Sequence, residues 1–317
     1  MTKKQQISNT IMMVRPAHFG YDEETAANNA FQTNDTSLSK ATISAKAREE
    51  FDLFVKGLRE AGVQVVVMDD TKAPRKPDAV FPNNWITTHE DGTVITYPMF
   101  APNRRQERQP HILESLREQF HVHKIIELEQ HESAEVFLEG TGSMIMDRPN
   151  NLVYACFSPR THPQLLSHFC KLVGCKEVCF SAVDAEGQDI YHTNVMMAVG
   201  ETFVVICLDT VRDPQERQML LDQFDATGKD VVEISIAQMM AFAGNMLQVR
   251  SSDGQPLLVM STQAYESLDL AQIQQLKKHT QLFHSPIHTI ETYGGGSARC
   301  MMAEIFLAGK EATPEEE

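Results

Sequence analysis

The stretch GSMIMDRPNNLVYACFSPRTHPQLLSHFCKLVGCKEVCF, residues 142–180, contains one complete structural unit. Its first part has two β-rich runs on either side of a Pro-Asn-Asn turn, which predicts a β-hairpin. The segment 162–174 that follows is predicted to be a helix, and residues 176–183 a further strand. The stretch therefore predicts a module with the order hairpin, helix, strand.

The same order of elements recurs along the whole chain. Asp-Gly turns, a strong hairpin signal, support two of the three other hairpins predicted at 85–97, 194–208 and 245–260. Helices are predicted at 44–61, 111–120, 213–224 and 266–279, and strands at 63–67, 121–128, 230–236 and 285–292. The final β-rich segment, 299–307, needs a partner, and we expect it to pair with the segment 9–19.

The strands that open the hairpins recur at nearly even spacing. Such spacing predicts a mixed α/β fold, a five-bladed pseudo-symmetric α/β propeller of repeated ββαβ modules, because closure into a ring removes exposed sheet edges. We expect one domain over residues 1–317, with flexible N-terminal residues and a disordered acidic tail at 310–317. The opening strands begin at Asn84, Gly140, Asn194, Asn245 and Cys300, which by subtraction are 56, 54, 51 and 55 residues apart.

Composition limits the class of protein. The chain has 42% hydrophobic and 22% charged residues, as soluble globular proteins do, and no apolar run approaches the ~20 residues of a membrane helix. We therefore expect a cytoplasmic protein with no membrane partner. The net charge of −15 argues against a nucleic-acid partner, and the six cysteines lack paired spacing and should be free thiols. No feature fixes the oligomeric state, so a homo-oligomer stays open.

The positions near the start of each hairpin also carry reactive side chains. In a ring these positions converge on the axis, and they supply Glu139, His192, Asn84, Asn194 and Cys300. A carboxylate, a histidine, two amides and a thiol are the groups that a nucleophilic site requires. Each also has a structural interpretation, since Asn-Asn often forms a turn and a free cysteine is most often a core residue.

Metal and nucleotide sites fit the sequence less well. His121 and His123 share one face of a predicted strand without further ligands nearby, and the later histidines lack the H-E-x-x-H spacing. The segment GGGS, residues 294–297, lacks the Gly-Lys-Ser/Thr ending of a phosphate-binding loop. We therefore predict that the protein uses no metal and no cofactor.

The chain resembles the guanidine-modifying superfamily of amidinotransferases and arginine deiminases in four motifs, FPNNW, LEGTGS, YHTNV and GGGSARCMM. Within that superfamily it is most similar to the citrulline ureidase branch, over nearly its full length. The resemblance implies a five-bladed propeller with Cys300 as nucleophile, His192 as general acid/base and Glu139 beside it. The flanking Arg299 and a His192 imidazolium would favour the thiolate form of Cys300.

The departures from arginine deiminases favour one substrate. Those enzymes carry aspartates where this chain has Asn84 and Asn194, and carboxylates suit a guanidinium, which is cationic and has only hydrogen-bond donors. A ureido group is neutral, and its carbonyl oxygen accepts a hydrogen bond that an amide can donate. The resemblance therefore implies hydrolysis of L-citrulline, a small amino acid, to ornithine, carbon dioxide and ammonia through a covalent intermediate on Cys300.

Several alternatives stay open. The resemblance points to Arg160, or to Arg104 or Arg105, as the group that binds the substrate α-carboxylate, although the latter two also suit an exposed helix start. The reaction could instead be deimination of arginine or a related guanidino compound, or amidino transfer to a second amine. A non-catalytic binding propeller, like the related ribosome anti-association factor, is the alternative from another class.

Overall fold

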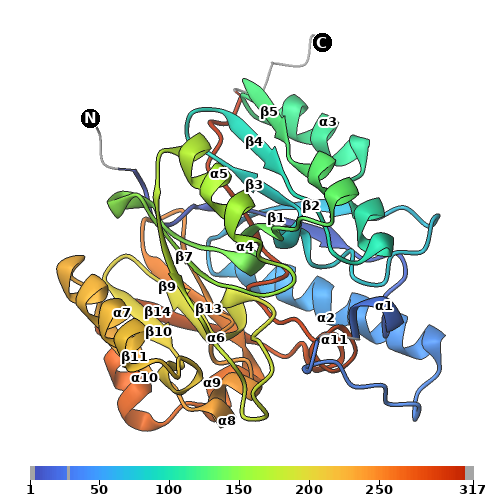
Figure 1. The fold of residues 1–317 in the computed structure, drawn as a ribbon. Coiled ribbons are helices and arrows are strands. Elements are labelled where there is room, and N and C mark those ends of the chain that lie inside the picture. The colour runs from blue at the N-terminus through green and yellow to red at the C-terminus, as the bar shows by residue number, and fades with distance from the viewer. Residues whose placement is uncertain (1–3, 27–28, 311–317) are drawn as a thin grey trace.

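The computed structural model describes residues 4–26 and 29–310 and shows five three-stranded sheets around a common centre (Figure 1). In every sheet the first two strands are antiparallel and the last two parallel. The predicted five-bladed α/β propeller is therefore confirmed. The blades are β15 (Ala303–Ile305), β1 (Thr10–Arg15) and β2 (Gln64–Asp69); β3 (Ile86–Thr88), β4 (Thr93–Thr96) and β5 (Lys124–Glu127); β6 (Ile145–Asp147), β7 (Leu152–Cys156) and β8 (Lys176–Phe180); β9 (Met197–Val199), β10 (Phe203–Ile206) and β11 (Asp230–Glu233); and β12 (Leu247–Arg250), β13 (Pro256–Ser261) and β14 (Gln281–Ser285).

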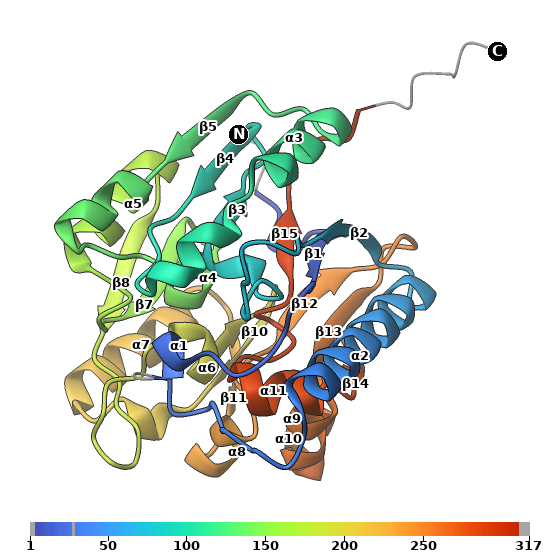
Figure 2. The same cartoon turned by 90° about the vertical axis from the view of Figure 1, so that its right-hand side faces the viewer.

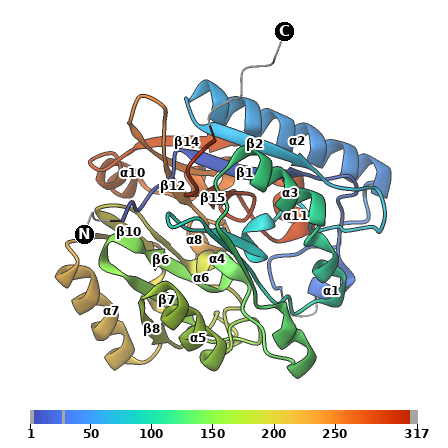
Figure 3. The same cartoon turned by 90° about the horizontal axis from the view of Figure 1, so that it is seen from above.

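A peripheral helix joins the second and third strands of each blade, and this crossover allows the two strands to run parallel. Figure 2 shows these helices around the outside while β1, β10, β12 and β15 lie near the centre, and Figure 3 shows α2 and α7 on opposite sides. No helix of the described residues is long and apolar enough to cross a membrane. The crossover helices are α2 (Lys40–Glu60), α3 (Pro110–Gln119), α5 (Pro163–Val173), α7 (Pro214–Ala226) and α10 (Leu270–Leu276).

The two ends of the chain complete one blade together. β1 pairs antiparallel with β15, with Thr10 opposite Ile305, and parallel with β2 on its other side. The predicted pairing of the segments 9–19 and 299–307 is thus confirmed. The expected flexible first residues and the acidic tail beyond Lys310 lie outside the described residues.

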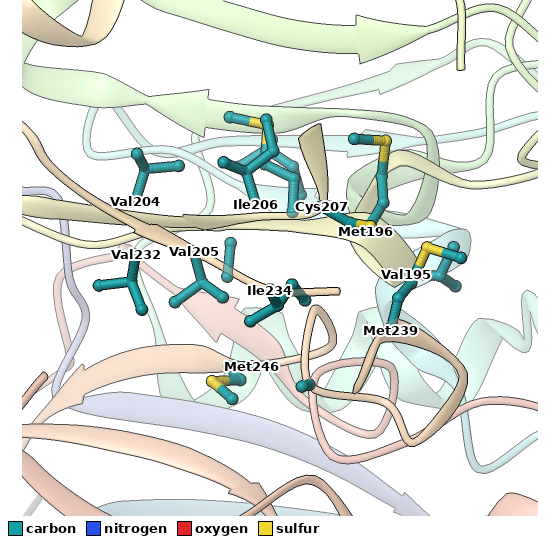
Figure 4. Packing of buried hydrophobic residues seen from close by; sticks show 14 of the residues in the cluster. Val195, Met196, Val204, Val205, Ile206, Cys207, Val232, Ile234, Met239 and Met246 are labelled. Atoms are coloured by element: carbon teal, nitrogen blue, oxygen red, sulfur yellow. The ribbon is translucent and has the colours of Figure 1, made fainter. Parts of the chain in front are cut away.

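The largest apolar core surrounds β10. Figure 4 shows Val204, Val205 and Ile206 among Val232 and Met246, and all five side chains are buried. Met246 directly precedes β12, so this core continues from the fourth blade into the fifth. All six cysteines are free thiols, as predicted.

Two predictions for the fifth blade are wrong. The helix over 266–279 is interrupted: α9 (Thr262–Ser267) ends, and Asp269 and Gln272 form a capping box that begins α10. The strand predicted at 285–292 lies earlier, as β14, and α11 (His288–Gly294) follows it. Glu50 of α2 stabilises this segment as a helix rather than a strand, because its carboxylate accepts hydrogen bonds of 2.8 and 3.0 Å from two N–H groups in the first turn of α11.

In three hairpins a helical turn precedes the first strand, which therefore begins later than predicted. A 3₁₀ turn at Pro82–Asn84 precedes β3, while α4 (Gly140–Ser143) precedes β6 and α6 (Thr193–Met196) precedes β9. By subtraction from Asn84, Gly140 and Asn194, the strands begin two, five and three residues after the predicted points. Asn84 and Asn194 lie in these turns, and Glu139 and His192 directly precede two of them, so these polar residues lie outside the strands.

Glu50→Ala is expected to lower the free energy of unfolding by about 1 kcal/mol, because two N–H groups of α11 lose their acceptor. For a chain of this size that loss lowers the midpoint of thermal unfolding by roughly 2 °C. Circular dichroism against Glu49→Ala, which removes a neighbouring exposed carboxylate, measures the difference. Equal midpoints for the two variants would contradict the capping role.

Candidate active site

Five polar side chains from four blades meet at the centre of the ring. They are buried, with no more than 4% of each residue exposed: Cys300, His192, Glu139, Asn84 and Asn194. All five were predicted from the repeat, and the structure places them in one cluster.

Glu139 and His192 form a buried pair. The Oε2 atom of Glu139 lies 2.7 Å from Nε2 of His192, while Oε1 accepts a hydrogen bond of 2.8 Å from Phe100 N. Burial alone would raise the pKa of Glu139, but the Arg160 guanidinium and the His192 hydrogen bond hold that pKa well below its ordinary value. Burial lowers the pKa of His192 to about 4 despite the carboxylate, so the imidazole is neutral near pH 7. The expected imidazolium is thus absent in this state.

The other ring nitrogen of His192 faces the remaining polar groups. A Cβ atom built on Gly142 would lie 2.8 Å from His192 Nδ1 and 2.3 Å from Asn84 Nδ2, so only glycine fits between them. A neutral imidazole that donates from Nε2 to Glu139 has an acceptor lone pair at Nδ1. His192 is therefore arranged to take a proton at Nδ1.

Two amides surround the Cys300 thiol. The Nδ2 atoms of Asn194 and Asn245 lie 3.4 and 3.2 Å from Sγ, and Cys300 N lies 3.4 Å from Asn245 Oδ1. N–H groups directed at sulfur stabilise negative charge on it. The repeat had located Asn245, but its role was missed because only the fold brings its side chain to the thiol.

Arg299 does not provide the positive charge that was expected beside the thiol. Its guanidinium donates to Met302 O at 2.8 Å and pairs with Glu304 at 3.0 Å. Its charge is therefore compensated, and the two amides supply the polar contacts to Cys300.

Arg104 fixes the orientation of Asn84. Its Nη1 atom donates to Asn84 Oδ1 at 2.9 Å, and its Nε and Nη2 atoms each lie 2.9 Å from the Glu107 carboxylate. Because Arg104 occupies the amide oxygen, the Nδ2 donor of Asn84 is left without a hydrogen-bond partner among the described residues. The site thus contains a fixed donor beside His192.

The other two candidate arginines differ in position. Arg160 is buried, with Nη1 at 3.4 Å from Glu139 Oε2, Nη2 donating to Thr25 O at 3.2 Å, and its guanidinium 4.9 Å above the Tyr191 ring. Arg105 instead donates to Met99 O and pairs with the half-buried Glu132 at 3.5 Å, and its side chain is 31% exposed. Arg104 and Arg160 therefore belong to the cluster, whereas Arg105 lies at its edge.

Asp78 is a further buried carboxyl group that sequence reasoning missed. Its Oδ2 atom accepts from Thr25 Oγ1 at 3.1 Å and lies 3.9 Å from Arg104 Nε, while Oδ1 has no partner among the described residues. Burial raises the pKa of Asp78 to about 8, despite Arg104. The carboxyl group is therefore mostly protonated near pH 7 in this state, and its unpartnered Oδ1 atom is a free hydrogen-bonding position. No cluster of histidine, cysteine or acidic side chains suited to a metal ion occurs in the described ranges.

A cysteine, a histidine and a glutamate at the axis of a five-bladed α/β propeller define the guanidine-modifying superfamily, which contains C–N hydrolases. A family model described as N,N dimethylarginine dimethylhydrolase, eukaryotic, matches residues 15–307, and the chain belongs to this family. No curated protein sequence matches the chain.

Solved structures with the same fold include two enzymes of this kind. One is the N-terminal domain of ArgZ, an arginine dihydrolase from cyanobacteria, with a TM-score of 0.73 and 17% identity over 94% of this chain and 99% of that domain. The chain spans 40% of full-length ArgZ. The other is a dimethylarginine dimethylaminohydrolase adduct with S-methyl-L-thiocitrulline, with a TM-score of 0.64 and 15% identity over 94% and 99% of the two chains. At these identities the likeness concerns the fold alone.

The neutral state of His192 predicts an unusual pH profile. If Nδ1 takes a proton during the reaction, kcat/KM should stay high as pH falls through 6.5, the ordinary histidine pKa, and decline towards pH 4. Steady-state rates between pH 4 and 8, with circular dichroism to exclude unfolding, measure this profile. A decline centred at or above pH 6.5 would show that an imidazolium is the resting form.

Asn245→Ala is expected to slow alkylation of Cys300 by iodoacetamide and to lower kcat, because the sulfur loses its shorter N–H contact. A lost hydrogen bond to a charged group typically costs about 1.5–3 kcal/mol, which is roughly a tenfold to hundredfold loss in rate. Asn34→Ala, at an exposed position, is the control. An unchanged alkylation rate in a folded Asn245→Ala protein would rule out support of the thiolate by Asn245.

Proposed function

We propose that this protein hydrolyses the ureido group of free L-citrulline to ornithine, carbon dioxide and ammonia through a covalent intermediate on Cys300. The observation that carries the proposal is the amide of Asn84, whose oxygen is bonded to Arg104 and whose Nδ2 donor faces the site. Asn194 is arranged oppositely, because its Nδ2 contacts Cys300 Sγ and its Oδ1 has no partner among the described residues. The Nδ2 donor of Asn84 complements the carbonyl oxygen of a ureido group, and the Oδ1 acceptor of Asn194 complements one of its N–H groups.

Each group has a defined role in the proposed reaction. The Cys300 thiol transfers its proton to His192 Nδ1 and attacks the ureido carbon, while Asn84 donates to the developing oxyanion. The protonated His192 gives its proton to the departing nitrogen, and the C–N bond breaks. His192 then accepts a proton from water, which attacks the S-carbamoyl intermediate. The C–S bond breaks, and His192 returns the proton to sulfur, which restores the thiol. If the bond to the ornithine nitrogen breaks first, hydrolysis of the intermediate releases carbamate, which decomposes to carbon dioxide and ammonia. If the bond to the terminal nitrogen breaks first, ammonia leaves and hydrolysis releases N-carboxy-ornithine, which loses carbon dioxide to give ornithine. Either order consumes one water.

The amino-acid end of the substrate would bind the buried ionic groups. Arg160 is the proposed partner of the α-carboxylate, because it is a buried guanidinium beside Glu139. Asp78 Oδ1 is the proposed acceptor for the α-ammonium. Burial raises the pKa of Asp78 to about 8 in the empty site. A bound ammonium group would lower that pKa and favour the ionised carboxylate.

Hydrolysis of arginine is the second candidate, because ArgZ is an arginine dihydrolase with a similar fold. A guanidinium, however, has no acceptor for the Asn84 donor, and it would bring a cation close to Arg104. A non-catalytic propeller would not need a buried Glu139–His192 pair and a thiol held by two amides. Amidino transfer would need a second amine at the same centre.

The substrate assay separates these functions. The purified protein is incubated separately with citrulline, arginine and dimethylarginine, and ornithine, citrulline and ammonia are measured. Citrulline should give equal amounts of ornithine and ammonia, and acid quenching should trap a carbamoyl group on the peptide that contains Cys300. Turnover of arginine or dimethylarginine without turnover of citrulline would overturn the proposal, and Cys300→Ser should abolish every activity.

Asn84→Asp tests the donor directly. Loss of one preorganised oxyanion donor typically lowers kcat by about 10²–10³-fold, and the carboxylate should lower citrulline turnover by a similar factor. Asn34→Asp makes the same change of charge at an exposed position and should leave kcat unchanged. A folded Asn84→Asp protein with wild-type turnover of citrulline would show that Asn84 does not contact the reacting group.

A further inference from the structure

A second cavity lies apart from the cluster around Cys300. It has a volume of about 420 Å³ and shares no lining residue with that cluster. Its walls come from β4, β5 and β6, the end of α5 and the N-terminal segment at Lys4, so it lies between the second and third blades. Neither the fold nor the proposed reaction accounts for it.

Arg148 is the buried charge in this cavity. Only 8% of the residue is exposed, and its guanidinium lies 3.9 Å from the centre of the Phe306 ring. Within residues 4–26 and 29–310, no carboxylate lies within 4 Å of the guanidinium, and no hydrogen bond satisfies it. Glu304 acts on its charge, but that carboxylate already forms an ion pair with Arg299 at 3.0 Å. A buried cation with no ion pair of its own is costly, so its presence beside an open cavity indicates an anionic partner.

The charges at the rim favour the same kind of ligand. Lys4 and Lys124 are exposed cations that line the cavity. The two acidic residues of the rim are already engaged, since Glu90 and Asp91 accept hydrogen bonds of 2.7 and 3.0 Å from backbone N–H groups. Lys4 in turn donates to Val173 O at 3.4 Å. With Arg148 the lining has three cationic and two acidic side chains, so by subtraction its formal charge of +1 favours an anion.

The rest of the wall is apolar or neutral. Ile95, Ile126 and Met146 line it together with residues from the end of α5. His89 adds no charge near pH 7, because burial and the neighbouring Arg148 lower its pKa to about 3. The cavity thus combines one buried cation with a hydrophobic surface.

We propose that this cavity binds a small organic anion, with its carboxylate or phosphate head on the Arg148 guanidinium and its apolar body against Ile95, Ile126 and Met146. Guanidinium groups bind both kinds of head group by paired hydrogen bonds. Pockets of this size that are mostly apolar with few polar groups are typical of small-molecule sites.

Cys175 provides a local test, because it lines the cavity, whereas Cys179 is equally half-buried and does not. Cleavage by trypsin after Lys176 separates the two thiols, so mass spectrometry can follow their alkylation by iodoacetamide independently. Benzoate or phenyl phosphate should slow alkylation of Cys175 alone, and benzamide should not. Arg148→Gln should weaken the protection at least about tenfold, whereas Arg117→Gln, on the exposed face of α3, should not.

Each outcome bears on the proposal. Protection by benzoate alone identifies a carboxylate ligand, protection by phenyl phosphate alone identifies a phosphate ester, and either supports the site. Protection by benzamide equal to that by benzoate would overturn it, as would equal protection in folded Arg148→Gln or no protection by either anion. If Arg148→Gln does not fold, Ile126→Trp, which fills the cavity, should abolish protection, and retained protection would contradict the site.

Discussion

The pairing of β1 with β15 is the interaction on which the rest of the structure depends. β1 lies between β15 and β2, so the first blade exists only when the two ends of the chain meet. By subtraction, Cys300 lies three residues before β15, and ring closure therefore carries its thiol to the axis. There Asn194 and Asn245, from two other blades, reach its sulfur. Formation of the site and closure of the ring are thus one event.

Charge compensation is the second constraint, because the axis is closed to solvent. Glu139 is held between Arg160 and His192, and Arg104 is held by Glu107. Removing one member of such a group leaves an uncompensated buried charge, which costs about 3–5 kcal/mol. Arg160 and Arg104 therefore stabilise the buried carboxylates of the cluster, and they hold Glu139 and Asn84 in place.

The repeat predicted more of the site than of the surrounding structure. An even period places equivalent positions at one centre, which is why Glu139, His192 and Cys300 could be found together from spacing and residue type. Asp78 lies outside the period, and its burial depends on the distant Thr25 and on Arg104. Similarly, α11 was mistaken for a strand because its cap, Glu50, is 239 residues away from it. Local propensity contains no information about contacts of that kind.

The choice between guanidino and ureido recognition depends on a contact, not only on a residue type. An asparagine can direct either its oxygen or its nitrogen at a ligand, so Asn84 alone leaves the polarity of the site undecided. Arg104 can only donate, and its bond to Asn84 Oδ1 therefore commits the amide nitrogen to the site. An aspartate at this position would place a carboxylate against Arg104 and present only acceptors to the substrate. The proposed recognition of a neutral substrate with an acceptor oxygen thus rests on the pair formed by Asn84 and Arg104, rather than on either residue.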